Sequence, residues 1–150
     1  MVPLGTRDLD DAAVRCQDGS MDEVPQFYGG SGGLVTAIGA GLDAAGLDRS
    51  ELHPADLAPV DEFHIRGRSA TLEIIDALDL TARSHVLDLG SGLGGPARTL
   101  AELTGCTVTG VDLTPEFCEA ATALSEWTGL SDRTRFQVGD ATATGLPDAI

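Results

Sequence analysis

Residues 85–96 read His85-Val86-Leu87-Asp88-Leu89-Gly90-Ser91-Gly92-Leu93-Gly94-Gly95-Pro96. The first five residues form a short apolar stretch typical of a strand, and four glycines then follow within six residues. The proline after them has a fixed helical φ and no N–H, which favours it in the first turn of a helix. The stretch therefore predicts a strand, a glycine loop and a helix in direct succession.

The glycine loop favours a ligand site. Glycine has no Cβ, so the backbone at Gly90, Gly92 and Gly94 leaves room for a ligand. The amides of residues 91–94 precede a helix N-terminus, where anionic groups are stabilised. A tight left-handed turn is the alternative explanation, but it needs only one or two glycines. Four of them favour the site.

A second acid follows the loop. Asp112 lies seventeen residues past Gly95, at the end of a strand predicted over residues 107–111. An acid there is placed to accept hydrogen bonds from ribose hydroxyls, so we expect an adenosine-containing cofactor. The pattern Gly90-x-Gly92-x-x-Gly95 also fits a dinucleotide fingerprint, which keeps NAD as an alternative. Asp88, however, would face a pyrophosphate, and it suits the sulfonium and ammonium groups of S-adenosylmethionine better.

Three segments carry a family resemblance. Residues 86–94 closely resemble motif I of the class I S-adenosylmethionine-dependent methyltransferases, and residues 111–114 and 139–141 resemble the next two motifs. The resemblance implies an α/β fold with a Rossmann-like parallel sheet. It also implies contacts to each part of the cofactor. Asp88 meets the ammonium or a bridging water, and residues 91–94 meet the methionine carboxylate. Asp112 binds the ribose hydroxyls, Leu113 packs on the adenine or ribose face, and Asp140 beside Ala141 reaches the exocyclic amine of adenine.

The N-terminal part carries a less specific resemblance. Tyr28-Gly29 and residues 61–68 resemble the N-terminal segments of sarcosine/dimethylglycine and phosphoethanolamine N-methyltransferases. The resemblance implies that Tyr28 is a lid residue and that Arg66 is a partner of a carboxylate or of the cofactor. A mixed-charge surface loop is the alternative for residues 61–68.

The order of patterns predicts three regions: a poorly ordered acidic N-terminus (1–24), a helical cap (25–80) and a cofactor-binding region (81–150). Strands alternating with helices of about ten residues indicate a parallel sheet. We expect strands over 85–89, 107–111 and 135–138; helices over 34–45, 67–78, 96–103 and 115–127; and a loop or short helical turns over 48–59. The sheet of the class I methyltransferases that the chain resembles has seven strands. The chain therefore looks like an N-terminal half that self-associates or needs a missing C-terminal half.

The composition limits the partners. Twenty-four acids oppose nine bases, all of them arginine, for a formal charge of −15. Coding bias or adaptation to high salt explains this balance, and either one makes nucleic acid and anionic membranes poor partners. No apolar run reaches the ~18–20 residues of a membrane span and no secretory signal is present, so a cytoplasmic location is expected. The three cysteines show no metal-ligand spacing, and no metal site is expected.

The predicted function is methyl transfer from S-adenosylmethionine to a small-molecule acceptor, with no catalytic residue identified. Two alternatives stay open. The chain is a non-catalytic fragment or pseudo-enzyme that binds the cofactor, or it is an NAD-binding oxidoreductase domain.

Overall fold

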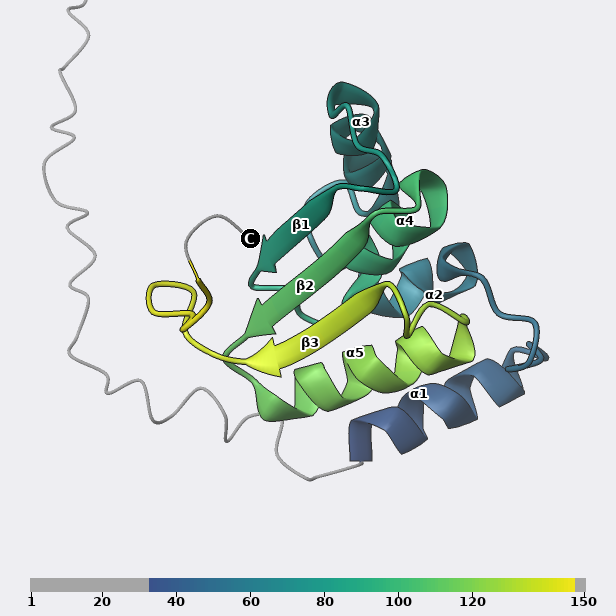
Figure 1. Cartoon of the computed structure of the whole chain (residues 1–150). Coiled ribbons are helices and arrows are strands. Elements are labelled where there is room, and N and C mark those ends of the chain that lie inside the picture. The colour runs from purple at the N-terminus through teal and green to yellow at the C-terminus, as the bar shows by residue number, and fades with distance from the viewer. Residues whose placement is uncertain (1–32, 148–150) are drawn as a thin grey trace, which may run out of the picture.

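The computed structural model describes residues 33–147, which form a parallel sheet with helices packed against it (Figure 1). The elements in chain order are α1 (Gly33–Ala44), α2 (Pro54–Asp61), α3 (Arg68–Ala77), β1 (His85–Leu89), α4 (Gly95–Thr104), β2 (Thr107–Asp112), α5 (Pro115–Trp127) and β3 (Thr134–Val138). The predicted α/β class and the incomplete Rossmann-like sheet are confirmed. None of the helices in the described part is long and apolar enough to cross a membrane.

The sheet has the order β1-β2-β3, and both pairs are parallel. Leu89 pairs with Val111, and Asp112 pairs with Val138. The carboxyl ends of the strands therefore meet at one edge, where the glycine loop and the acids that follow β2 and β3 lie together. Within residues 33–147, β1 has β2 as its only strand neighbour.

Two apolar clusters hold the helices in place. One lies between α3, α4 and β2 and contains Ile75, Ala97, Leu100, Ala101, Cys106 and Val108. The other lies between α1, α2 and α5 and contains Ile38, Leu42, Leu52, Leu57, Leu93, Ala120 and Leu124. Leu93 belongs to the glycine loop, so its burial anchors that loop to the three helices around it.

The segment expected to be a loop or short helical turns contains one short helix, α2. Pro54 starts the helix, and the backbone N–H of His53 donates to Asp56 Oδ2 at 2.9 Å. Pro59 lies in the second half of this short helix, where its missing N–H removes one intrahelical bond.

The buried face of α3 includes a polar contact. The helical period puts Leu72, Ile75 and Leu78 on one face, but Leu72 is 37% exposed and Leu78 is 46% exposed. The buried residues are Thr71 and Ile75. The Thr71 hydroxyl donates to the buried Glu62 carboxylate at 2.8 Å.

Thr114 stands at the N-cap of α5, but its side chain makes no capping hydrogen bond. Its own N–H donates instead to Asp112 Oδ1 at 2.9 Å. Gly46 and Gly129 follow the ends of α1 and α5, with positive φ values of 75° and 68°. Cys106 and Cys118 are buried free thiols.

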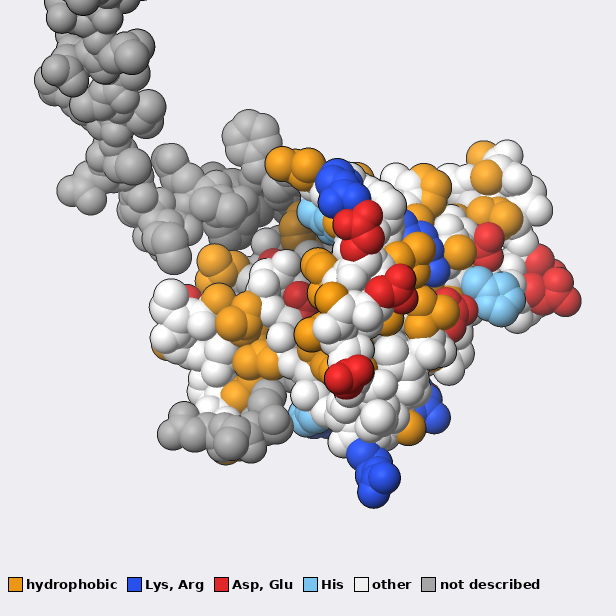
Figure 2. Space-filling view, turned by 90° about the horizontal axis from the view of Figure 1, so that it is seen from above, with side chains coloured by type: hydrophobic (Ala, Val, Ile, Leu, Met, Phe, Trp, Pro, Cys, Tyr) orange, Lys and Arg blue, Asp and Glu red, His pale blue; other side chains and the backbone are white. Residues whose placement is uncertain are grey.

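The face seen from above in Figure 2 carries apolar side chains exposed among charged ones. Phe63 is 78% exposed, Ile65 is 89% exposed, and Ile74 of α3 is 58% exposed. The segment that leads from α2 into α3 therefore presents apolar side chains to solvent.

Substitution of Gly110 by alanine is expected to lower the free energy of unfolding by about 1–3 kcal/mol, the usual cost of overpacking. A Cβ at this position of β2 would lie 2.5 Å from Phe136 Cδ1 and 2.7 Å from Ser91 Oγ. Gly41→Ala is the matched control, because a Cβ there meets nothing within 4 Å and alanine favours a helix interior by about 0.5–1 kcal/mol. Chemical denaturation of both variants checks the prediction, and equal effects would contradict it.

Candidate functional site

The glycine loop between β1 and α4 has the backbone that only glycine adopts readily. Gly90, Gly92 and Gly94 have φ values of 77°, 53° and 76°. A Cβ at Gly90 or Gly92 would meet nothing within 4 Å, so open space lies in front of the loop at both positions. The predicted room is therefore present at Gly90 and Gly92. It is absent at Gly94, where a Cβ would lie 2.5 Å from Phe136 Cζ, so this glycine allows close packing inside the protein.

Internal hydrogen bonds fix most amides of the loop. Gly90 N–H and Ser91 N–H both donate to Val111 O, at 2.8 and 3.1 Å, and Gly94 N–H donates to Ser91 O at 2.9 Å. Gly92 N–H donates to Asp112 Oδ2 at 2.8 Å. No acceptor among residues 33–147 takes the N–H of Leu93. Of the amides of residues 91–94, Leu93 N–H is thus the one left to a ligand.

Asp112 connects the end of β2 to the loop. Its Oδ2 accepts from Gly92 N–H, and its Oδ1 accepts from Thr114 N–H. The β1–β2 register brings Leu89 beside Val111 and so places the two strand ends side by side. The glycine loop and Asp112, which the sequence predicts to act together, are therefore in direct contact.

Asp88 is the carboxyl of the site whose pKa is raised. Burial raises the pKa of Asp88, and the negative charges of Asp112 and Glu62 raise this pKa further, while His64 opposes them. Its Oδ2 is buried and has no hydrogen-bond partner among the described residues. A buried carboxylate oxygen without a donor is costly, and it marks a position where a ligand cation or N–H group would be stabilised.

Asp88→Asn is expected to raise the melting temperature of the unliganded chain near pH 7. Because the folded-state pKa of Asp88 is raised, ionisation of Asp88 opposes folding, and this penalty is absent below the pKa of the unfolded chain. The gain should therefore be largest near pH 7 and shrink as the pH falls toward about 4. Thermal melts across this range check the prediction.

Asp48→Asn is the matched control for that series. Hydrogen bonds from Ser50 lower the pKa of Asp48, so its ionisation favours folding and its substitution should lower the melting temperature near pH 7. A lower melting temperature for Asp88→Asn at pH 7 would contradict the assignment of Asp88 as a destabilising charge.

Asp140 follows β3 at the same edge of the sheet. Its Oδ1 accepts from the N–H and the hydroxyl of Thr142, both at 2.7 Å, and these bonds lower the pKa of Asp140. Gly139 N–H donates to Asp112 O at 2.9 Å, which ties this turn to the end of β2. Ala141 is exposed, and Leu113 is 51% exposed. Contacts of these three residues with a cofactor stay a prediction.

Arg66 makes its ion pair away from the glycine loop. The guanidinium of Arg66 pairs with Glu73, and both side chains are more than half exposed. Arg66 is also the one non-glycine residue with positive φ (74°) in the described chain, which is a strained conformation. Tyr28 lies outside the described residues, so its role as a lid residue stays a prediction.

A polar cluster near Asp88 was not assigned from the sequence. Glu62 Oε2 accepts from Thr71 Oγ1 and lies 2.7 Å from His64 Nε2. His64, Thr71 and Asp88 line a mainly apolar cavity of about 260 Å³ beside β1. The sequence placed residues 61–68 either on the surface or in the pocket wall. Phe63 is 78% exposed and Glu62 is buried, so the segment is a surface loop only in part. Its place in the wall of a cofactor pocket stays a prediction.

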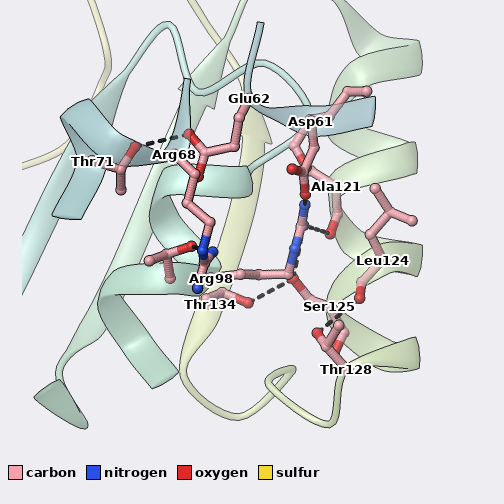
Figure 3. A network of polar contacts seen from close by, with 12 residues as sticks. Asp61, Glu62, Arg68, Thr71, Arg98, Ala121, Leu124, Ser125, Thr128 and Thr134 are labelled. Carbon is pink, nitrogen blue, oxygen red and sulfur yellow. Dashed lines mark hydrogen bonds and ion pairs between the residues drawn. The ribbon is translucent and has the colours of Figure 1, made fainter. Parts of the chain in front are cut away.

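A second residue that sequence reasoning missed is Arg98, the largest fully buried side chain in the described chain. Its guanidinium pairs with Asp61 (Figure 3) and also donates to the carbonyl of Leu93. The available signal was an arginine between Ala97 and Leu100 on the otherwise apolar face of a helix. Residues 33–147 contain no cluster of three or more metal-ligating side chains.

Comparison with known proteins gives consistent matches over the second half of the chain. Residues 86–150 match the family model described as Methyltransferase domain. The chain is 36% identical over 86 residues to methyltransferase GfsG of Streptomyces halstedii, covering 57% of the chain and 31% of that protein. It is 44% identical over 63 residues to a probable chloroplastic tocopherol O-methyltransferase of Oryza sativa subsp. japonica, covering 42% of the chain and 17% of that protein.

Among solved structures, the YcgJ protein of Bacillus subtilis is similar with a TM-score of 0.51 at 30% identity. The similar region covers 54% of this chain and 34% of that one. The chain thus spans less than a third of the length of the two curated relatives.

Proposed function

We propose that the chain, whose residues 86–150 match the Methyltransferase domain model, is part of a class I S-adenosylmethionine-dependent methyltransferase. In this proposal it binds S-adenosylmethionine at the glycine loop for methyl transfer to a small-molecule acceptor. The observation that carries the proposal is the arrangement of three groups at one sheet edge. The open loop at Gly90 and Gly92, the Asp112 carboxylate bonded to that loop, and the unpartnered Oδ2 of Asp88 lie together.

The charges of the site favour a cationic ligand. Asp112 and Glu62 are close enough to Asp88 to raise its pKa, so these carboxylates repel one another in the unliganded chain. A ligand that carries a sulfonium and an ammonium relieves this repulsion. The pyrophosphate of NAD would add negative charge beside the same carboxylates, which argues against the dinucleotide alternative.

In this proposal, different residues contact different parts of the cofactor. Asp88 Oδ2 accepts from the ammonium, and Leu93 N–H donates to the methionine carboxylate at the N-terminus of α4. Asp112 accepts from the ribose hydroxyls. Asp140 with Ala141 and Leu113 surrounds the adenine, where Leu113 offers a half-exposed apolar side chain.

The chemistry depends on alignment. S-adenosylmethionine, when bound, supplies an electrophilic methyl group. The chain holds that group and the acceptor in line and excludes water, which does not require a covalent protein intermediate. The roles of Tyr28 as a lid residue and of Arg66 as a partner of a carboxylate or of the cofactor belong to the same proposal. A small-molecule acceptor is supported by the names of matched relatives, which include tocopherol O-methyltransferase and phosphoethanolamine N-methyltransferase.

Calorimetric titration of the chain with S-adenosylhomocysteine and, separately, with NAD tests the proposal. Binding of S-adenosylhomocysteine without binding of NAD is expected. NAD binding with no S-adenosylhomocysteine binding would overturn the proposal and favour the oxidoreductase alternative.

The second candidate is cofactor binding without turnover, because the groups that the described residues bring to this sheet edge are all assigned to the cofactor and none to an acceptor. Transfer of radiolabel from S-adenosylmethionine to a panel of amines, phenols and sterols separates the two. Reproducible transfer by the purified chain would reject the non-catalytic candidate.

A further inference from the structure

We propose that Arg98 is a positioning residue for the cofactor. Its guanidinium binds the Leu93 carbonyl and thereby holds the backbone of the glycine loop in the conformation that presents Leu93 N–H to the ligand. The inference rests on the proposed function and adds to it a residue that lies behind the loop. It also links the cap helix α2 to cofactor binding.

The environment of Arg98 is unusual for an arginine. Its side chain is fully buried in α4, whose other buried side chains are Ala97, Thr99, Leu100 and Ala101, none of them charged. Burial lowers the pKa of Arg98, and the carboxylate of Asp61 opposes this shift. Apolar side chains of similar volume are often as stabilising as a buried ion pair. Stability alone therefore does not account for an arginine at this position.

Three directions of contact converge on the guanidinium. Nη2 donates to Asp61 Oδ2 and to Leu93 O, both at 2.6 Å, and Nη1 donates to Ala121 O at 3.0 Å. Figure 3 shows Arg98 between Asp61 and Ala121. One side chain thus joins the end of α2, the glycine loop and the middle of α5.

The carbonyl that Arg98 binds lies in a part of the backbone with much conformational freedom. Leu93 lies between Gly92 and Gly94, whose backbones reach many conformations in the absence of contacts. A hydrogen bond to Leu93 O restricts the rotation of the adjacent peptide groups. Because Leu93 N–H is the amide left to a ligand, fixing this segment before binding lowers the entropic cost of binding.

The link to α2 is close. A Cβ at Gly95 would lie 2.6 Å from Asp61 O and 2.7 Å from Asp61 Oδ1, so the end of α2 touches the first residue of α4. Asp61 also orients the guanidinium through its Oδ2. A displacement of α2 would therefore move Arg98 and, with it, the Leu93 carbonyl.

The test compares two ligands that share the adenosine part. S-adenosylhomocysteine carries the amino-acid part that meets the glycine loop, and 5′-deoxy-5′-methylthioadenosine lacks it. Arg98→Lys, which cannot reproduce the planar fork, should lower the affinity for S-adenosylhomocysteine by about tenfold and that for methylthioadenosine by less than about twofold. A merely structural role of Arg98 would move both affinities together.

Arg133→Lys is the matched control. Arg133 Nη1 donates to the carbonyl of Gly105, which follows the opposite end of α4, so this substitution also removes an arginine–carbonyl contact but far along the chain from the loop. It should leave both affinities unchanged. Thermal melts of each variant confirm that the protein compared is folded.

The double variant Asp61→Leu with Arg98→Met covers the case in which Arg98→Lys fails to fold, because it removes both charges and leaves neither unpaired. It should show the same difference between the two ligands. Equal losses for both ligands, or unchanged S-adenosylhomocysteine affinity, would overturn the role of Arg98 alone. A wild-type chain that binds no S-adenosylhomocysteine would instead overturn the proposed function, and the inference with it.

Discussion

Asp61→Ala is expected to lower the free energy of unfolding by about 3–5 kcal/mol, the typical cost of leaving a buried charge without its partner. The side chains of Asp61 and Arg98 are both fully buried, and their Oδ2 and Nη2 atoms are 2.6 Å apart. A loss of this size is a large part of the total stability of a small domain, which is about 5–15 kcal/mol. Denaturant titration checks it, with Trp127, the one tryptophan of the chain, as the fluorescent reporter.

Asp43→Ala is the control for this prediction. Asp43 pairs with Arg49 in the same kind of carboxylate–guanidinium contact, but the two side chains are 58% and 41% exposed. An exposed pair contributes about 0–1 kcal/mol, so the two substitutions should differ by several kilocalories per mole. An equal loss of unfolding free energy for Asp61→Ala and Asp43→Ala would mean that water reaches Arg98. It would contradict the burial of Arg98 between α2, α4 and α5.

Asp112→Ala should weaken the binding of S-adenosylhomocysteine by roughly ten- to a hundredfold. The carboxylate of Asp112 holds Gly92 N–H and is the proposed acceptor for the ribose hydroxyls, so the substitution removes both functions. Hydrogen bonds to a charged group contribute about 1.5–3 kcal/mol, which corresponds to this range of affinity. Calorimetric titration of the variant measures the effect.

Asp48→Ala is the matched substitution for Asp112→Ala. Asp48 Oδ1 accepts from the N–H of the residue two positions later, Ser50, as Asp112 Oδ1 does from Thr114, but Asp48 lies in the loop after α1. Its replacement should leave the affinity unchanged. An Asp112→Ala variant that binds S-adenosylhomocysteine as tightly as the wild type would show that the end of β2 does not meet the ribose.

The strands and the glycine loop were predictable from the sequence, because they depend on local chemistry. The strand over residues 85–89 and the helix over residues 115–127 were predicted to the residue, since apolar runs, a glycine cluster and Pro115 act within a few positions of the chain. The proximity of the loop to Asp112 was also predictable. It follows from the rule that the carboxyl ends of parallel strands share one edge of the sheet.

The contacts that cross the fold were decided by tertiary structure. Thr71 rather than Leu72 became the buried residue of α3 because Glu62 lies nine positions away in sequence and reaches it in space. Arg98 became the centre of a buried network because Asp61, Leu93 and Ala121 converge on it from three separate elements. Propensity and periodicity describe a residue and its near neighbours. Which carboxylate meets which donor in the interior depends on how the helices pack, so the sequence determined the elements and the cofactor loop, and the packing determined what holds that loop in place.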